Sequence, residues 1–188
     1  PLSPEDVASG RVIIASPGRW TTAALALALW APGVRTVEVP FGEIQAGVAE
    51  GRFDGGLLIH EGQLTFGDDG LVEVVDLGRW WKSETGLPLP LGGNVARKDL
   101  GPERIARISR ALKRSIEYGL AHRESALTHA LGYARGLDRE RADRFVGMYV
   151  NEWTRGYGTE GRRAVQTLLD RGAAAGRIPP TRAEYAPD

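Results

Sequence analysis

Cysteine is absent from the 188-residue sequence, and histidine occurs only three times. Without cysteine the chain can form neither disulfides nor thiolate metal sites, and it has no cysteine nucleophile. Several catalytic signatures are also missing: there is no G-x-S-x-G motif, no histidine pair of the zinc-protease type, and no glycine spacing typical of a dinucleotide or phosphate loop. These absences disfavour serine hydrolases, zinc proteases and the common nucleotide-binding enzymes. We expect neither a metal nor a cofactor.

Long hydrophobic runs are absent as well. The longest apolar stretch, from Ala23 to Ala31, is far shorter than the roughly 20 residues that a membrane-spanning helix requires. The first residues lack the charged, apolar and small-residue pattern of a secretory signal. We therefore expect a soluble, cytoplasmic protein without a membrane partner.

The sequence has no net charge, but its charges are unevenly distributed. Residues 1–94 contain 6 Lys and Arg against 12 Asp and Glu, whereas residues 95–188 contain 18 against 12. A basic half is compatible with nucleic-acid binding. Its arginines, however, are spread over several helical segments with acids between them, and no basic and aromatic motif accompanies them. Solvated helix faces explain this pattern better, so we expect no nucleic-acid partner.

Short apolar runs alternate with helical patterns in the first half of the chain. Three runs are typical of buried strands: residues 11–16, 36–40 and 53–60. Two helical patterns lie between them, at residues 21–30 and 43–49. This order predicts a parallel α/β lobe over residues 1–94. Two further extended segments, residues 71–77 and 87–95, follow the turn residues at 67–70.

The second half changes to a helical pattern at about Asp99. Apolar residues there repeat every three or four positions, which predicts three helices with buried stripes. The stripes comprise Ile105, Ile108, Leu112, Ile116 and Leu120; Ala142, Phe145, Tyr149 and Trp153; and Ala164, Val165, Leu168 and Leu169. Pro102 marks the start of the first helix and Asp138 is a candidate N-cap of the second. Residues 95–188 either form an independent bundle or complete a lobe begun elsewhere.

The first candidate site is the stretch SPGRWTTA at residues 16–23, where a predicted strand ends and a helix begins. Free backbone N–H groups and the helix dipole favour an anion at such a junction, and the hydroxyl of Thr21 or Thr22 adds a donor. A carboxylate or phosphate group of a ligand suits this position. The simpler interpretation is that a threonine only caps the helix.

The second candidate site is His60, in the stretch LIHEG at the end of the third predicted strand. Ligands of parallel α/β sheets bind outside the carboxyl ends of the strands, so both candidate sites face the same crevice. A histidine there can act as a general base near neutral pH. The alternative is a histidine that is hydrogen-bonded at a strand end and has no chemical role.

Three other features carry weaker functional interpretations. Glu61 points away from His60 if the strand continues, so we interpret it as a structural or supporting residue. His122 and His129 have no nearby carboxylate spacing that makes a metal site, and we interpret both as surface or packing residues. Residues 86–94 combine two prolines with three glycines, which is typical either of a hinge between lobes or of an edge strand that ends in a turn.

Several motifs, in this order and spacing, resemble one family, the 1,4-dihydroxy-6-naphthoate synthases of the futalosine route to menaquinone. The resembling stretches are PGRWTTA at residues 17–23, LLIHEGQLTF at 57–66, GLVEVVDLGRWW at 70–81, TGLPLPLG at 85–92 and YVNEWT at 149–154. The His-Glu pair after an apolar strand distinguishes this family from the chorismate dehydratases of the same pathway.

The resemblance implies a two-lobed α/β fold similar to the type 2 periplasmic binding proteins. Residues 1–94 are then one lobe, and residues 95–188 are a helical segment that belongs to the other lobe. Family members begin with a strand-rich segment that has no match in this sequence. We expect either that this segment is carried on a separate piece or that the chain is a truncated form whose cleft is incomplete.

The resemblance also implies a cofactor-free lyase that acts on a small molecule, cyclic dehypoxanthinyl futalosine. The family's catalytic histidine corresponds to His60, and its substrate-contacting pair corresponds to Thr22 and Ala23, with Thr21 beside them. Two alternatives remain at this stage: a solute-binding protein of the same fold that closes on a small anion, and a chorismate dehydratase.

Overall fold

The computed structural model describes residues 2–133 and 138–186 and divides into two compact units. The first, the α/β unit, comprises Pro1–Leu91 and Arg163–Arg182. The second, the helical unit, comprises Gly92–Arg162 and Ala183–Asp188. The boundary at Leu91 and Gly92 falls within the proline and glycine segment of residues 86–94. The assignment of residues 95–188 to the other lobe of a two-lobed fold stays a prediction.

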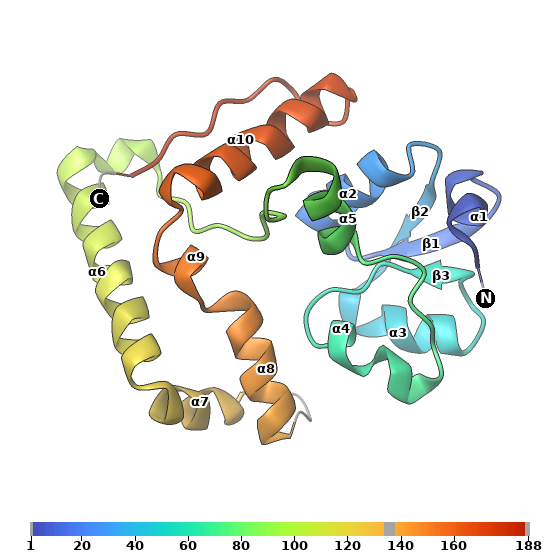
Figure 1. The fold of residues 1–188 in the computed structure, drawn as a ribbon, viewed down its shortest axis with the longest axis horizontal. Coiled ribbons are helices and arrows are strands. Elements are labelled where there is room, and N and C mark those ends of the chain that lie inside the picture. The colour runs from blue at the N-terminus through green and yellow to red at the C-terminus, as the bar shows by residue number, and fades with distance from the viewer. Residues whose placement is uncertain (1, 134–137, 187–188) are drawn as a thin grey trace. The chain divides into compact units, whose positions relative to one another are not determined.

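A small parallel sheet forms the centre of the α/β unit, as the sequence predicts (Figure 1). Its strands are β1 (Ile13–Ser16), β2 (Arg35–Glu38) and β3 (Gly55–Gly56), in the order β2-β1-β3. The strand β1 is therefore central, with Ser16 opposite Glu38 and Ala15 opposite Gly56 in parallel register. The three strands thus end at the same edge of the sheet.

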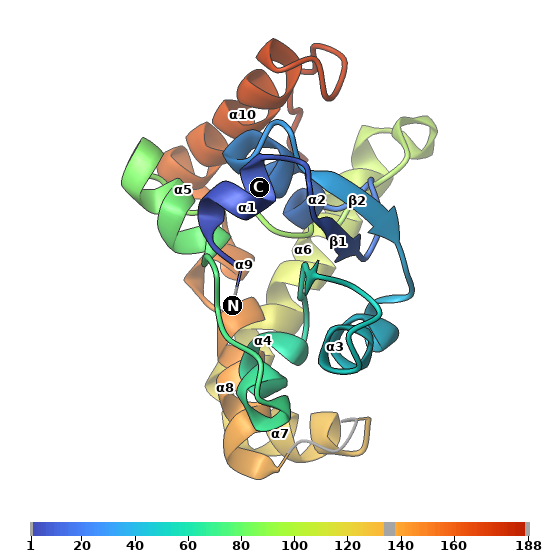
Figure 2. The same ribbon diagram turned by 90° about the vertical axis from the view of Figure 1, so that its right-hand side faces the viewer.

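Helices cover both faces of this sheet. They are α1 (Pro4–Ala8), α2 (Thr22–Trp30), α3 (Phe41–Ala49), α4 (Gly62–Thr65), α5 (Leu77–Thr85) and the greater part of α10 (Gly158–Ala174), with the 3-10 helix η1 (Phe66–Asp69) after α4. Figures 1 and 2 show α2 and α5 on one face and α3 and α4 on the other. The core on the α2 face is built around Ile14, Leu27 and Leu57, all buried.

The two glycines of β3 leave room for neighbouring side chains to pack closely against the strand. A Cβ on Gly55 would lie 2.9 Å from Cδ1 of Ile14, and one on Gly56 would lie 2.5 Å from Cγ2 of Ile44. Both distances are shorter than van der Waals contact. Ile44, on α3, is fully buried. Because neither residue has a side chain, the core side chains can pack directly against this short strand.

The third strand is shorter than the predicted strand over residues 53–60. Leu57 N–H still donates to the carbonyl of Ala15 at 2.8 Å, but the ladder ends there. The chain then turns at His60, whose φ of 55° lies in the left-handed region, and α4 begins at Gly62. The apolar run predicted a longer strand. Leu57 is apolar because it is buried in the core, and a residue can be buried without being paired in a strand.

The helix α5 was not predicted from the sequence. The predicted extended segment at residues 71–77 leads into this helix and forms no strand. Asp76 caps this helix, since its side chain accepts a hydrogen bond from Arg79 N–H at 2.9 Å. Trp81, on α5, is fully buried. The second extended segment, residues 87–95, contributes no strand to the sheet among the described residues.

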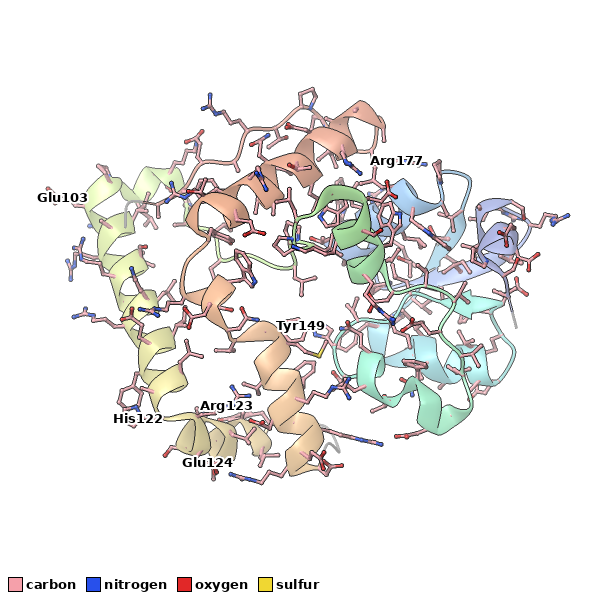
Figure 3. The ribbon with its side chains drawn as sticks, in the orientation of Figure 1. Glu103, His122, Arg123, Glu124, Tyr149 and Arg177 are labelled. Carbon is pink, nitrogen blue, oxygen red and sulfur yellow. The ribbon has the colours of Figure 1, made fainter. Side chains whose placement is uncertain are left out.

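The helical unit contains, within its described residues, η2 (Lys98–Leu100), α6 (Pro102–Ala121), α7 (Arg123–Leu131), α8 (Arg139–Tyr149), α9 (Glu152–Arg155) and the start of α10. Asp138 is the N-cap of α8, as predicted. Arg123 joins α7 to α8, because its Nε lies 2.8 Å from Oδ1 of Asp143 and its Nη2 donates to the Asp143 carbonyl at 2.8 Å. Figure 3 shows His122 and Arg123 where α6 gives way to α7.

Two sequence predictions for the helical unit are wrong. The stripe on α6 is not buried: Ile108 is 41% exposed and Leu112 is 43% exposed. The neighbours of α6 in its unit include the short elements η2 and α9, which cover only part of its apolar face. The pattern from Ala142 to Trp153 is not one helix either, because Asn151 accepts from Trp153 N–H at 3.0 Å and starts α9.

No helix in the described ranges combines the length and the apolar character needed to cross a bilayer.

Candidate functional site

The candidate site lies at the carboxyl edge of the parallel sheet. The strand β1 leads into the turn that carries Thr21 and Thr22, β2 leads into α3, and β3 leads into the turn at His60. Since β1 is the neighbour of both other strands, all three segments leave the sheet at adjacent positions. This is the edge at which ligands bind in open α/β sheets.

Thr21 is the N-cap of α2. Its hydroxyl accepts from Ala24 N–H at 3.1 Å and donates to the Gly18 carbonyl at 2.9 Å. The capping interpretation therefore applies to Thr21, and both bonds lie within the loop and the first helical turn. A role for Thr21 in substrate binding stays a prediction.

Thr22 and Ala23 are the first two residues of α2. Their N–H groups belong to the first turn, whose amides have no acceptor within the helix. The Thr22 hydroxyl donates to the Leu91 carbonyl at 3.3 Å, and Ala23 packs against the core of the α/β unit. The helix start thus offers amides to a ligand, and the Thr22 hydroxyl can donate to a ligand in exchange for the Leu91 carbonyl.

The turn before α2 already binds one carboxylate of the chain itself. Arg19 N–H donates to Oε1 of Glu38, at the end of β2, at 3.1 Å. Ser16, the last residue of β1, is polar and buried, and it directly precedes this turn in the sequence. The contact shows that the backbone between β1 and α2 can accommodate a negative group, as expected for a strand-to-helix junction.

His60 is exposed and follows β3 by four residues. Among the described residues, it is the one residue other than glycine whose φ is positive. Its carbonyl accepts from Gln63 N–H at 3.3 Å and from Gln63 Nε2 at 3.2 Å. The imidazole ring faces Phe41, with ring centroids 4.8 Å apart and an interplanar angle of 53°. The ring is therefore accessible on one side and contacts an aromatic neighbour on another.

A polar cluster joins α3 to the segment after His60. Gln45 Nε2 donates to Oδ2 of Asp69 at 2.7 Å, and the Thr65 hydroxyl lies 3.1 Å from Oε1 of Gln45. The Thr65 hydroxyl also lies 3.3 Å from the Glu61 carbonyl. Glu61 occupies the N-cap position of α4 without a side-chain capping bond. Its backbone carbonyl holds the Thr65 hydroxyl, and the structural role of the Glu61 side chain stays a prediction.

Three residues near His60 were not predicted as site residues from the sequence: Phe41, Gln45 and Gln63. Phe41 follows the second predicted strand, so the rule that ligands bind at the carboxyl ends of strands could have identified it. Gln45 and Gln63 lie on helices and carry no sequence signal, because their roles arise from contacts between segments that are distant along the chain.

The other two histidines belong to the helical unit. His122 Nδ1 lies 2.9 Å from the Tyr118 carbonyl, and its ring stacks on Tyr118 at 4.0 Å. His129 faces Tyr133 at 5.3 Å. Within the described ranges, no group of three or more histidine, aspartate and glutamate side chains is placed to hold a metal ion.

Comparisons with known proteins agree on one family. A family model described as "Menaquinone biosynthesis" matches residues 3–174. A curated relative from Thermus thermophilus, named 1,4-dihydroxy-6-naphtoate synthase, is 45% identical over 168 residues, which cover 89% of this chain and 62% of the relative. A relative of the same name from Streptomyces coelicolor is 37% identical over 172 residues, or 88% of this chain and 61% of the relative.

A crystal structure of a protein from Archaeoglobus fulgidus is also similar. The two chains are 41% identical with a TM-score of 0.87, over 94% of this chain and 67% of the other. The present chain thus spans about three fifths of the length of the two curated relatives.

Proposed function

Because this chain belongs to the menaquinone-biosynthesis family, we propose that it acts in the formation of 1,4-dihydroxy-6-naphthoate, with His60 as the general base. The proposed substrate is cyclic dehypoxanthinyl futalosine, a small molecule, and the reaction is a lyase step without a cofactor. The observation that carries the assignment is the position of His60, exposed at the carboxyl edge of the parallel sheet. The proposed location is the cytoplasm.

In the proposed reaction, His60 removes a proton from the sugar-derived part of the substrate. The electron pair of the broken bond to hydrogen then forms a new double bond while a carbon–carbon bond breaks, and the dihydroxynaphthoate leaves with the electron pair of that bond. The amides of Thr22 and Ala23 and the Thr22 hydroxyl hold an anionic or hydroxyl-bearing part of the substrate. Fixed donors of this kind favour a developing negative charge because they need no reorientation during the reaction.

We further propose that the fold is similar to the type 2 periplasmic binding proteins. In this proposal residues 1–94 are one lobe and residues 95–188 belong to the other. The division of residues 1–91 and 92–162 between two compact units supports a two-lobed description, with the difference that residues 163–182 pack with the first unit.

Replacement of His60 by Asn tests the assignment. We expect a decrease in kcat of about 10²–10⁴-fold, the range that a positioned acid or base contributes. Binding of substrate, measured by calorimetry, should change little, because Asn retains polarity and tolerates positive φ. Turnover is measured as release of dihydroxynaphthoate from the cyclised substrate. His122→Asn is the matched control, since His122 is an exposed histidine of the helical unit.

Normal turnover of His60→Asn would remove the assignment of His60. Tight binding without turnover in the unaltered chain would instead favour a solute-binding protein. Dehydration of chorismate by the unaltered chain would favour the related dehydratase.

A further inference from the structure

The contact between Phe41 and His60 connects two different strand ends. Phe41 is the first residue of α3, directly after β2, and His60 lies in the turn after β3. Since β2 and β3 flank β1, the two segments approach each other from opposite sides of the central strand. The ring centroids are 4.8 Å apart at 53°, within the range and geometry that aromatic pairs favour.

The backbone on both sides of this contact is fixed by packing. Phe41 lies one helical turn before Ile44, which is fully buried and packs against Gly56 of β3. Pro40 precedes Phe41, and its carbonyl accepts from Glu43 N–H at 2.8 Å. The same contact between Ile44 and Gly56 therefore anchors α3 and the strand that leads to His60.

The backbone of His60 is held separately from its ring. Its carbonyl accepts two hydrogen bonds from Gln63, and its φ of 55° fixes the direction in which the side chain leaves the chain. An exposed histidine on a fixed backbone still has several staggered side-chain rotamers. A neighbouring ring that packs on the imidazole selects among them.

We propose that Phe41 is a positioning residue for His60: its ring holds the imidazole in one orientation at the carboxyl edge of the sheet. The inference deepens the proposed function and rests on it for its catalytic consequence. Phe41 has no group that can transfer a proton, so its effect acts through the orientation of His60. A general base must lie within hydrogen-bond reach of the proton that it removes, so loss of this orientation lowers the rate.

The contact itself is tested by NMR of the full chain with labelled histidine. The three histidines give three sets of ring signals, and His60→Asn identifies the set of His60. In Phe41→Leu, which removes the aromatic ring but keeps an apolar side chain, the His60 signals should move and show averaging over rotamers. The signals of His122 and His129 should stay in place. Tyr118→Leu is the matched control, because it should move the His122 signals and leave those of His60 unchanged.

The catalytic consequence is tested by steady-state kinetics. Phe41→Leu should lower kcat at least about tenfold with a smaller change in KM, since it disturbs the base and not the groups that hold the ligand. Phe41→Tyr keeps the ring and should restore most of kcat. Circular dichroism and urea unfolding of each variant separate this effect from a loss of folding.

The outcomes distinguish the two proposals. Unmoved His60 signals in a folded Phe41→Leu variant would overturn the positioning role. Normal kcat in Phe41→Leu, together with an inactive His60→Asn, would also overturn it and leave the base assignment intact. Full activity of His60→Asn would overturn the base assignment, whereas moved signals would still establish the contact between the rings.

Discussion

At the scale of single residues, Asp76 shows how one side chain fixes the start of an element. Its carboxylate accepts from Arg79 N–H at 2.9 Å and from Arg79 Nε at 2.8 Å. Partial burial alone would raise the pKa of Asp76, but the hydrogen bonds from the Arg79 backbone and side chain outweigh it and lower the pKa below its ordinary value. Since α5 carries the buried Trp81, this cap also stabilises the core.

Replacement of Asp76 by Ala should destabilise the protein by about 1 kcal/mol, the usual contribution of an N-cap, measured by urea unfolding. Because the folded-state pKa is lowered, the ionic part of this stabilisation is present above the unfolded carboxyl value. It is lost as the pH falls below about 4 and through the folded value. The difference in unfolding free energy between the two proteins should therefore shrink in acid. Asp76→Asn keeps a capping oxygen, so it should lose less stability at neutral pH; an equal loss would contradict the capping argument.

At the scale of elements, Gly56 of β3 controls how closely α3 approaches the sheet. Ile44 and Val48, one turn apart on α3, both lie close to Gly56. The short strand thus positions α3 and, through it, Phe41. The sequence predicts a strand here from its apolar residues, but Gly56 decides how closely the helix packs.

Gly56→Ala should destabilise the protein by about 1–3 kcal/mol, the typical cost of overpacking. The added Cβ would lie 2.5 Å from Cγ2 of Ile44 and 3.0 Å from Cγ2 of Val48, so α3 or its side chains must move. Thermal and urea unfolding measure the loss. Gly42→Ala, on the same helix and with no atom within 4 Å of the added Cβ, is the control and should be neutral or slightly stabilising. Equal stability of the two variants would refute the packing argument.

At the scale of the whole molecule, the α/β unit is built from two separate parts of the chain. Residues 163–182 return to the unit formed by residues 1–91. Arg171 lies over the ring of Trp81 with its Cζ 5.2 Å from the centroid. Arg177, labelled in Figure 3, donates to the Pro32 carbonyl at 2.7 Å. Residues 163–182 therefore contribute to the packing of the unit that residues 1–91 form.

Truncation after Arg162 should destabilise the α/β unit much more than truncation after Arg182. The shorter chain loses Arg171 and Arg177 and exposes the face of Trp81 that Arg171 covers, whereas the longer chain keeps both contacts. Near-ultraviolet circular dichroism and tryptophan fluorescence should show the loss of fixed packing. Similar unfolding curves for the two truncated proteins would show that α10 is not part of the unit.

The sequence by itself determined the order strand, helix, strand, helix, strand over residues 11–60, the parallel α/β class, and the helix cap at Asp138, and it offered a threonine cap for the first of these helices. These features depend on local hydrophobic period and capping chemistry, which act between neighbours along the chain. The sequence also identified His60 and the start of α2 as candidate site segments, since both follow strands and parallel strands end at one edge. The motifs that carried the family resemblance led to the same residues.

Only the tertiary structure decided the length of β3, the exposure of the stripe on α6, and the contact between Phe41 and His60. Local pattern predicts an apolar face, but burial depends on which elements cover it, as the exposed Ile108 and Leu112 show. The backbone turn at His60 and the approach of Phe41 depend on packing between β2, α3 and β3, which are separate in sequence. For that reason the sequence could identify His60 as a candidate base, whereas the ring that faces it, Phe41, is known only from the structure.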